Sequence, residues 1–141
     1  MSLLSVFDIA GSAMNAESMR LNVTASNLAN ADSVAASAAG AYRARHPIFA
    51  TQLRQFAADP NFDSPGVGVR VLDVIQSGAA PAKRYQPDHP LADAAGYVYG
   101  SNVNPVEELT NMISAARSFQ GNVEVMTTAR DLVLKTLALG R

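Results

Sequence analysis

The sequence predicts an α+β fold in which long N- and C-terminal amphipathic helices pack together as a coiled coil, with a small β-rich insert between them. Apolar residues recur every three or four positions near both ends, which is the spacing of a helical stripe. Aromatic residues make up only 6% of the chain, which suits close-packed helices better than a thick mixed core. We therefore expect residues 1–33 together with 101–141 to form one helical domain, and residues 34–100 to form a linker and the insert.

Composition excludes several classes of function. The net charge is -1 and there is no basic run, so bulk electrostatics favour neither nucleic acid nor an anionic membrane as a partner. The absence of cysteine excludes disulfides and thiolate metal sites. The N-terminal stretch lacks the pattern of a cleaved secretory signal, because Asp8 interrupts its early apolar residues. No apolar run approaches the length of about 18 residues that a membrane span requires.

The N-terminal helix is expected from Leu3 to about Asn30. Four large apolar residues recur in it at intervals of one heptad: Phe7, Met14, Leu21 and Leu28. We expect this row to face the C-terminal helix. Alone in water the helix is marginal, because most helical stability comes from packing of an amphipathic face.

The C-terminal helix is expected within Ser101 to Arg141. Asn104 is a favourable N-cap, Pro105 fits the first helical position, and Gly140 is a plausible C-cap. The stripe of this helix that we expect to pack and to assemble comprises Leu109, Met112, Ile113, Ala116, Phe119, Val123, Met126, Leu134 and Leu137. A helix this long exceeds the needs of a compact domain of ordinary proportions.

Arg130 interrupts that stripe at a position where charge is costly. One interpretation is an ion pair between subunits, with Glu17 of the first helix as the candidate partner. The favoured alternative is an arginine at the edge of the stripe, with its stem packed and its head in water.

The middle of the chain contains a flexible link and several strands. Ala35–Ala41 is rich in Ala and Ser and is interpreted as the link. A strand is expected to begin near Tyr42 and to resume after Pro47. Residues 64–66 (Ser-Pro-Gly) predict a type II turn before the best strand, Val67–Ile75.

Two further short strands are expected in the loop-rich segment between Ser77 and Gly100. Arg84-Tyr85 is expected to pair with Tyr97-Val98-Tyr99. These strands complete the small β insert.

Several stretches resemble a known family. The Asn-rich helix end Leu21–Asn30 is similar to that of flagellar axial proteins, which are rod, hook and hook-associated proteins. A more specific resemblance, to the proximal rod proteins of the flagellar basal body, rests on Gly40–Arg45, Tyr85–Pro90, Asn102–Leu109 and Asn111–Arg117. The match covers nearly the whole chain and departs from the family pattern at residues 32–39.

The resemblance implies a structural subunit that self-assembles in the rod through its terminal helices and transmits torque. It implies other rod proteins and the membrane-embedded basal ring as partners, a periplasmic place in the basal body, and type III export without a cleaved signal peptide. Asn27 and Asn30 join the apolar residues of both helices and Arg130 in the expected assembly interface. The alternative is a soluble coiled-coil adaptor or secretion chaperone, which needs neither the β insert nor the Asn-rich helix end.

Candidates for chemistry are weak. His46 and His89 lie far apart with no metal-ligand spacing, and His89 sits between Asp and Pro in a turn. Gly66-Val67-Gly68 precedes a strand where a phosphate-binding loop requires a helix N-terminus. We therefore expect no enzyme, no cofactor and no small-molecule substrate.

Overall fold

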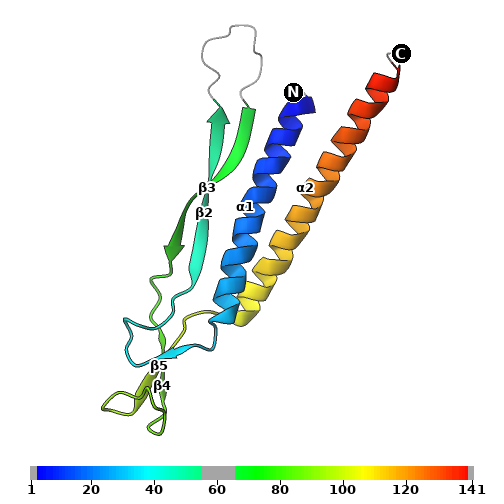
Figure 1. The fold of residues 1–141 in the computed structure, drawn as a ribbon. Helices are drawn as coiled ribbons and strands as arrows, with labels where there is room; N and C mark the ends of the chain where they lie inside the picture. The colour runs from blue at the N-terminus through cyan, green and yellow to red at the C-terminus, as the bar shows by residue number, and fades with distance from the viewer. Residues whose placement is uncertain (1–2, 55–65, 140–141) are drawn as a thin grey trace. The chain divides into compact units, whose positions relative to one another are not determined.

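The computed structural model describes residues 3–54 and 66–139. Its elements follow in the order α1 (Leu3–Ala29), β1 (Val34–Ala35), β2 (Arg45–Arg54), β3 (Gly66–Gln76), β4 (Ala82–Tyr85), β5 (Tyr97–Gly100) and α2 (Pro105–Leu139). Figure 1 shows the two terminal helices as unbroken ribbons, with every strand between them in sequence. The helices pack together, which confirms the predicted α+β class.

Small residues are the most buried part of α1. Ala10, Ala16 and Val23 are buried, and Asn27 is 0% exposed. The predicted heptad row of Phe7, Met14, Leu21 and Leu28 is only half-buried. Small side chains allow closer approach of neighbouring backbones, so the deepest positions of this helix are not its largest apolar residues.

The N-terminus of α2 forms as predicted. Asn104 Oδ1 accepts a hydrogen bond from the backbone N–H of Val106 at 3.1 Å. The backbone oxygen of Asn104 accepts from the N–H of Glu108 at 3.0 Å. Asn104 is therefore the N-cap and Pro105 the first helical residue, where the missing amide hydrogen costs nothing. The predicted C-cap, Gly140, lies outside the described residues.

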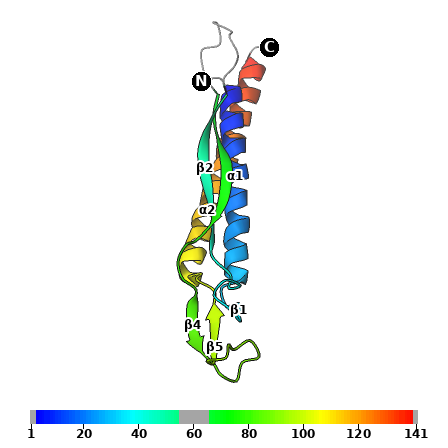
Figure 2. The ribbon, with the colours of Figure 1, turned by 90° about the vertical axis from the view of Figure 1, so that its left-hand side faces the viewer.

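The three-stranded sheet has the order β1-β5-β4 (Figure 2). The predicted pairing of β4 with β5 is confirmed, because Arg84 lies opposite Val98 and Tyr85 opposite Tyr97 in an antiparallel ladder. The prediction of a flexible link from Ala35 is wrong at its first residue. Ala35 belongs to β1 and pairs with Tyr99 of β5 in an antiparallel ladder, so the ladder hydrogen bonds order this residue.

The second sheet is the two-stranded pair β2-β3. The predicted strand Val67–Ile75 is confirmed and is one residue longer at each end. The strand expected near Tyr42 begins instead at Arg45 and runs through Pro47 without a break. The N–H groups of Ala44 and Arg45 bond to side chains from other segments, which delays the start of the ladder. The predicted turn at residues 64–66 lies outside the described residues apart from Gly66.

The chain divides into two compact units. One comprises Met1–Met19, Ile48–Asp73 and Ser114–Arg141, and the other comprises Arg20–Pro47 and Val74–Ile113. In the second unit a small core joins Ala31, Ala44 and Val103, with Tyr42 packed against them. The predicted division into a terminal helical domain and a central insert stays a prediction. Within the described ranges, no helix is long and apolar enough to cross a membrane.

Candidate assembly interface

Asn27 is the most completely bonded side chain of the Asn-rich helix end. Its Nδ2 donates to the backbone oxygen of Arg45 at 2.8 Å and to Oε1 of Glu108 at 3.0 Å. Its Oδ1 accepts from the N–H of Arg45 at 2.9 Å and from the hydroxyl of Tyr42 at 3.0 Å. The side-chain amide of Asn27 thus bonds to both the N–H and the carbonyl oxygen of Arg45. A residue of a neighbouring β-strand makes the same pair of bonds with its backbone. Both polar atoms of this buried side-chain amide are hydrogen-bonded. Any movement that breaks the bonds of either atom leaves a buried polar atom without a partner, which is costly.

The same contacts join three segments that are distant in sequence. Asn27 lies near the end of α1, Arg45 begins β2, and Glu108 lies in the first turns of α2. Glu108 is only 4% exposed, so its carboxylate depends on hydrogen bonding in place of water. We call the group formed by Asn27, Tyr42, Arg45 and Glu108 the Asn27 hub.

Asn30, the other asparagine of the expected assembly interface, is not part of the Asn27 hub and instead caps the C-terminal end of α1. Its Nδ2 donates to the backbone oxygen of Ser26 at 2.8 Å. Its backbone oxygen accepts from the hydroxyl of Ser33 at 2.8 Å. Asn30 therefore satisfies carbonyl groups that the end of α1 leaves without helical partners.

One face of α2 is buried or half-buried along its length. We call this face the inner seam, and its members recur with heptad spacing: Glu108, Met112, Ala115, Phe119, Asn122, Met126, Ala129 and Val133. Ala115 is 0% exposed and Ala129 5% exposed. Large and small residues alternate in this seam, which favours close packing of the two helices.

A second face of α2 is apolar and exposed. Each of its positions directly follows an inner-seam position, or continues that spacing beyond the ends of the seam. We call this face the outer stripe: Val106, Leu109, Ile113, Ala116, Gln120, Val123, Thr127, Arg130, Leu134 and Leu137. Ile113 is 55% exposed, Leu134 57% and Leu137 64%. Gln120, Thr127 and Arg130 interrupt this surface, and Ala116 is half-buried, so the exposed apolar side chains gather mainly toward the two ends of α2. Exposed apolar patches of this kind are typical of interaction sites.

The structure divides the predicted interface residues of α2 between these two faces. Met112, Phe119 and Met126 belong to the inner seam. The rest belong to the outer stripe: Leu109, Ile113, Ala116, Val123, Arg130, Leu134 and Leu137. The single stripe expected from the sequence is therefore two parallel stripes that share one helix.

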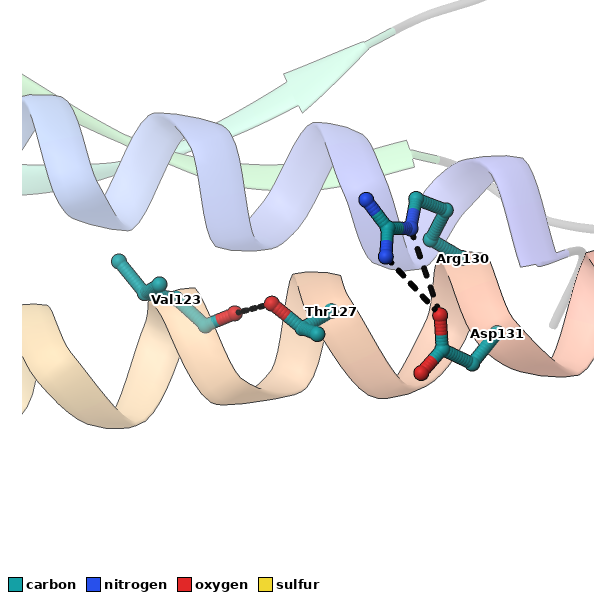
Figure 3. Close-up of polar contacts among 4 residues, drawn as sticks. All are labelled: Val123, Thr127, Arg130 and Asp131. Atoms are coloured by element: carbon teal, nitrogen blue, oxygen red, sulfur yellow. Dashed lines mark hydrogen bonds and ion pairs between the residues drawn. The ribbon is translucent and has the colours of Figure 1, made fainter.

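Arg130 lies in the outer stripe with its head group largely in solvent. Its Nε and Nη2 approach Oδ1 of Asp131 at 3.3 and 3.2 Å, and both side chains are exposed (Figure 3). The hydroxyl of Thr127, a neighbouring stripe residue, donates to the backbone oxygen of Val123 at 2.9 Å, so its polar group is satisfied within the helix (Figure 3). The exposed head group fits the part of the favoured interpretation that places it in water, and the packing of its stem stays a prediction. An exposed ion pair of this kind contributes little to stability.

The loop between β4 and β5 is held by Asp93. Its Oδ1 accepts from the N–H groups of Tyr97 and Ala95, both at 2.9 Å, and its Oδ2 accepts from the hydroxyl of Tyr99 at 3.3 Å. The bond from Tyr97, helped by those from Ala95 and Tyr99 and by the charge of Lys83, lowers the pKa of Asp93 below its ordinary value. The ammonium of Lys83 lies 3.9 Å from the centre of the Tyr97 ring.

Sequence reasoning missed Glu108, Tyr42 and the small residues of the inner seam. Alanine ranks below leucine and isoleucine in hydropathy, so the apolar pattern took large residues from both faces and passed over Ala115 and Ala129. A signal was present in Ala115, Asn122 and Ala129, which repeat at heptad spacing from Glu108. Among the residues described, no cluster of three or more His, Asp or Glu side chains is arranged to hold a metal ion.

Two family models match the two ends of the chain. The family model described as "Flagella basal body rod protein" matches residues 7–41. The model described as "Flagellar basal body rod FlgEFG protein C-terminal" matches residues 94–139. These ranges hold most of α1 and all of α2, including Asn27 and the outer stripe.

Whole-length relatives give the same result. The chain is 51% identical to the flagellar basal-body rod protein FlgC of Yersinia enterocolitica over 141 residues, which cover 100% of both chains. It is 50% identical to FlgC of Salmonella typhimurium, again over 100% of both chains. FlgC of Buchnera aphidicola subsp. Baizongia pistaciae is 32% identical over the same length. The chain therefore belongs to the FlgC family of flagellar basal-body rod proteins, which are structural subunits of the rod.

Proposed function

We propose that the outer stripe of α2 is the surface through which this rod subunit binds helices of neighbouring subunits, including further copies of itself. The observation that carries the proposal is the run of exposed Leu, Ile and Val side chains at heptad spacing on a helix whose other face is already packed. Full burial of one such side chain contributes about 1.5–3 kcal/mol. Several together suffice to hold a helix of the next subunit.

The remaining predicted residues have a different role in this proposal. Phe7, Met14, Leu21 and Leu28 of α1, together with Met112, Phe119 and Met126, hold the helix pair within one subunit. Asn27 and Asn30 fix the end of α1. In this proposal the residues of the outer stripe join one subunit to the next. Torque then passes from subunit to subunit through helices that are held rigidly within each subunit. A heterologous contact of this type generates rings or open stacks.

The decisive experiment exchanges apolar for polar residues inside and outside the outer stripe. Leu134→Ser lies in the stripe at 57% exposure, whereas Leu132→Ser lies beside it at 49% exposure on the same helix. We expect Leu134→Ser to reduce swimming and the yield of intact basal bodies at least tenfold, with an unchanged melting curve of the isolated chain. Leu132→Ser is the matched control and should retain both swimming and the yield of intact basal bodies.

Three outcomes count against this use of the stripe. Equal loss of assembly in both variants would mean that any polar substitution on α2 is harmful. Normal motility of Leu134→Ser combined with Ile113→Ser would remove the stripe from the interface altogether. A lowered melting temperature of Leu134→Ser would place Leu134 in the packing of the subunit itself.

We further propose that the subunit occupies the periplasmic part of the basal body, next to the membrane-embedded basal ring, after type III export without cleavage. In support, Leu3–Ala29 folds as α1 and supplies Ser12 and Asn27, so removal of a signal-length segment deletes contacts of the fold. Mass spectrometry of rods should find the subunit with its N-terminal residues retained. A form trimmed by signal peptidase contradicts this route.

A further inference from the structure

The chain has four tyrosines, and three of them lie on one face of the β4-β5 strand pair. Lys83 lies opposite Tyr99, and Tyr85 lies opposite Tyr97. Residues directly opposite each other in an antiparallel pair share a face, and successive residues alternate between the two faces. Val98, between the two β5 tyrosines, is 0% exposed, so the tyrosines lie on the outer face of the sheet. We call the following residues the tyrosine face: Lys83, Tyr85, Tyr97 and Tyr99.

The rings of the tyrosine face are held in place by neighbouring groups. Tyr85 and Tyr97 meet edge to face, with their ring centres 5.2 Å apart. The hydroxyl of Tyr99 donates to Oδ2 of Asp93 at 3.3 Å. Tyr85 is nevertheless 66% exposed. An ordered, exposed tyrosine is typical of a binding surface, because its ring covers a large area at a small cost in conformational entropy.

Lys83 places a positive charge in the middle of this aromatic surface. Its ammonium lies 3.9 Å from the ring centre of Tyr97 and 5.9 Å from that of Tyr99, while the residue itself is exposed. Charged groups on one side of a specific interface are matched by opposite charges on the other side. The tyrosine face therefore fits a partner with apolar side chains beside a carboxylate.

The start of α2 has this chemistry. Val106 is 72% exposed, Leu109 46% and Ile113 55%, and their spacing places them along one side of the helix. This is the spacing of the residues by which a helix docks on a partner. Glu107 is exposed beside these residues, which are the N-terminal end of the outer stripe.

We propose that the tyrosine face of one copy of this chain receives the N-terminal end of the outer stripe of a second copy, with Glu107 against Lys83. The inference rests on the proposed use of the outer stripe in assembly and names the surface that receives one end of it. The contact joins two different surfaces of the same chain. A contact of this heterologous kind extends into a ring or an open stack instead of ending at a closed pair.

The two surfaces have matching dimensions. Residues 106–113 rise about 10 Å along the helix axis. The four residues of β4 extend about 13 Å. Both surfaces belong to the same compact unit, so each is complete within Arg20–Pro47 and Val74–Ile113. Apolar contact with the rings supplies the attraction, and the Glu107–Lys83 pair sets the orientation of the helix on the sheet.

The test is an exchange of charges. Lys83→Glu and Glu107→Lys each place like charges at the contact, so each should lower swimming and the yield of intact basal bodies by about tenfold or more. A chain that carries both substitutions has opposite charges at every contact again and should recover the parent yield. The matched control combines Lys83→Glu with Glu124→Lys, another exposed acid of α2, and should stay defective.

Mixing the two single variants separates a contact between copies from a contact within one chain. Co-expression of Lys83→Glu and Glu107→Lys should restore part of the yield, because the altered face of one copy fits the altered helix of the other. A pair within one chain is not restored by mixing. Failure of both the double variant and the mixture overturns the proposal, since the charges then face a different protein or act inside the subunit.

Tyr85 tests the apolar part of the contact without a change of charge. We expect Tyr85→Ser to lower the yield of basal bodies by about tenfold or more, the loss typical of a tyrosine at the centre of an interface. Tyr85→Phe keeps the ring and should retain the yield. Normal assembly of Tyr85→Ser removes the tyrosine face from the interface, and a lowered melting temperature of the isolated Tyr85→Ser chain assigns Tyr85 to the fold instead.

These results are distinguishable from failure of the outer stripe as a whole. Leu134 lies at the other end of α2 and outside the proposed contact. Normal motility of Leu134→Ser together with rescue by the charge exchange would leave the contact at Glu107 standing. Loss of assembly in Leu134→Ser without rescue by the exchange would keep the stripe and remove only the tyrosine face.

Discussion

Ser12 and Gly68 approach each other so closely that a side chain at Gly68 would crowd the Ser12 hydroxyl. A Cβ placed on Gly68 lies 3.0 Å from Oγ of Ser12. The same Oγ accepts a hydrogen bond from the N–H of Val69 at 3.1 Å and donates to the backbone oxygen of Ile9 at 2.8 Å. The hydroxyl therefore joins α1 to β3 at a point of close approach that glycine accommodates without displacement of Ser12.

We expect Gly68→Ala to destabilise the chain by about 1–3 kcal/mol, the usual cost of overpacking. The urea midpoint of the isolated chain measures this cost. In the Ser12→Ala background the cost should shrink, because the atom at 3.0 Å is gone and the remaining contact with Cβ of Ser12 is 3.5 Å. Additive losses in the double variant would show that the two residues do not interact.

At Gly121 we expect substitution by alanine to stabilise the chain, in contrast to Gly68→Ala. It lies inside α2, is exposed, and a Cβ added there meets nothing within 4 Å. Alanine in a helix interior is favoured over glycine by about 0.8–1 kcal/mol. We expect Gly121→Ala to raise the midpoint of thermal unfolding of the isolated chain by a few degrees. An unchanged or lower midpoint contradicts an open site at Gly121.

The lowered pKa of Asp93 predicts that the stability of the fold depends on pH in the acid range. Hydrogen bonds from Tyr97, Ala95 and Tyr99 lower the folded pKa below the ordinary value of 3.8. The ionised carboxylate therefore stabilises the fold above the unfolded pKa, and this contribution is lost as the pH falls through the folded pKa. We expect Asp93→Asn to be less stable than the parent chain at pH 7 and to differ less from it as acidification proceeds below about pH 4.

Tyrosine fluorescence in urea reports this difference, because the chain has four Tyr residues and no Trp. The matched control is Asp88→Asn, an exposed residue of the same loop, which should follow the parent chain across the whole range. The prediction fails if the difference in the free energy of unfolding between Asp93→Asn and the parent chain is the same at pH 7 and at pH 3, because a lowered pKa of Asp93 requires that difference to shrink on acidification.

Leu21 and Phe119 test the packing of the helices within a subunit. Both side chains are half-buried, so truncation should cost less than the 2–5 kcal/mol or so of a fully buried residue. We expect Leu21→Ala and Phe119→Ala each to lower stability by about 1–3 kcal/mol and to reduce assembly as a consequence. Chemical denaturation gives the first effect and motility the second. Full motility in both variants contradicts the proposed packing.

The sequence alone determined the elements whose signals are local. The cap at Asn104 and Pro105, the β3 strand and the pairing of β4 with β5 follow from short-range geometry and spacing. The family also followed from sequence, because its motifs lie at matching positions along the chain. These features depend on the backbone of a few neighbouring residues and not on what packs against them.

Only the tertiary structure decided which face of α2 is buried. The apolar residues of α2 are shared between two stripes one residue apart, and the local pattern does not say which of them is buried. Asn27 bonds Glu108 at the start of the inner seam, a contact between residues far apart in the chain. Small residues of the seam such as Ala115 are fully buried, although their hydropathy is modest. Such choices depend on the partner surface, which no local sequence pattern contains.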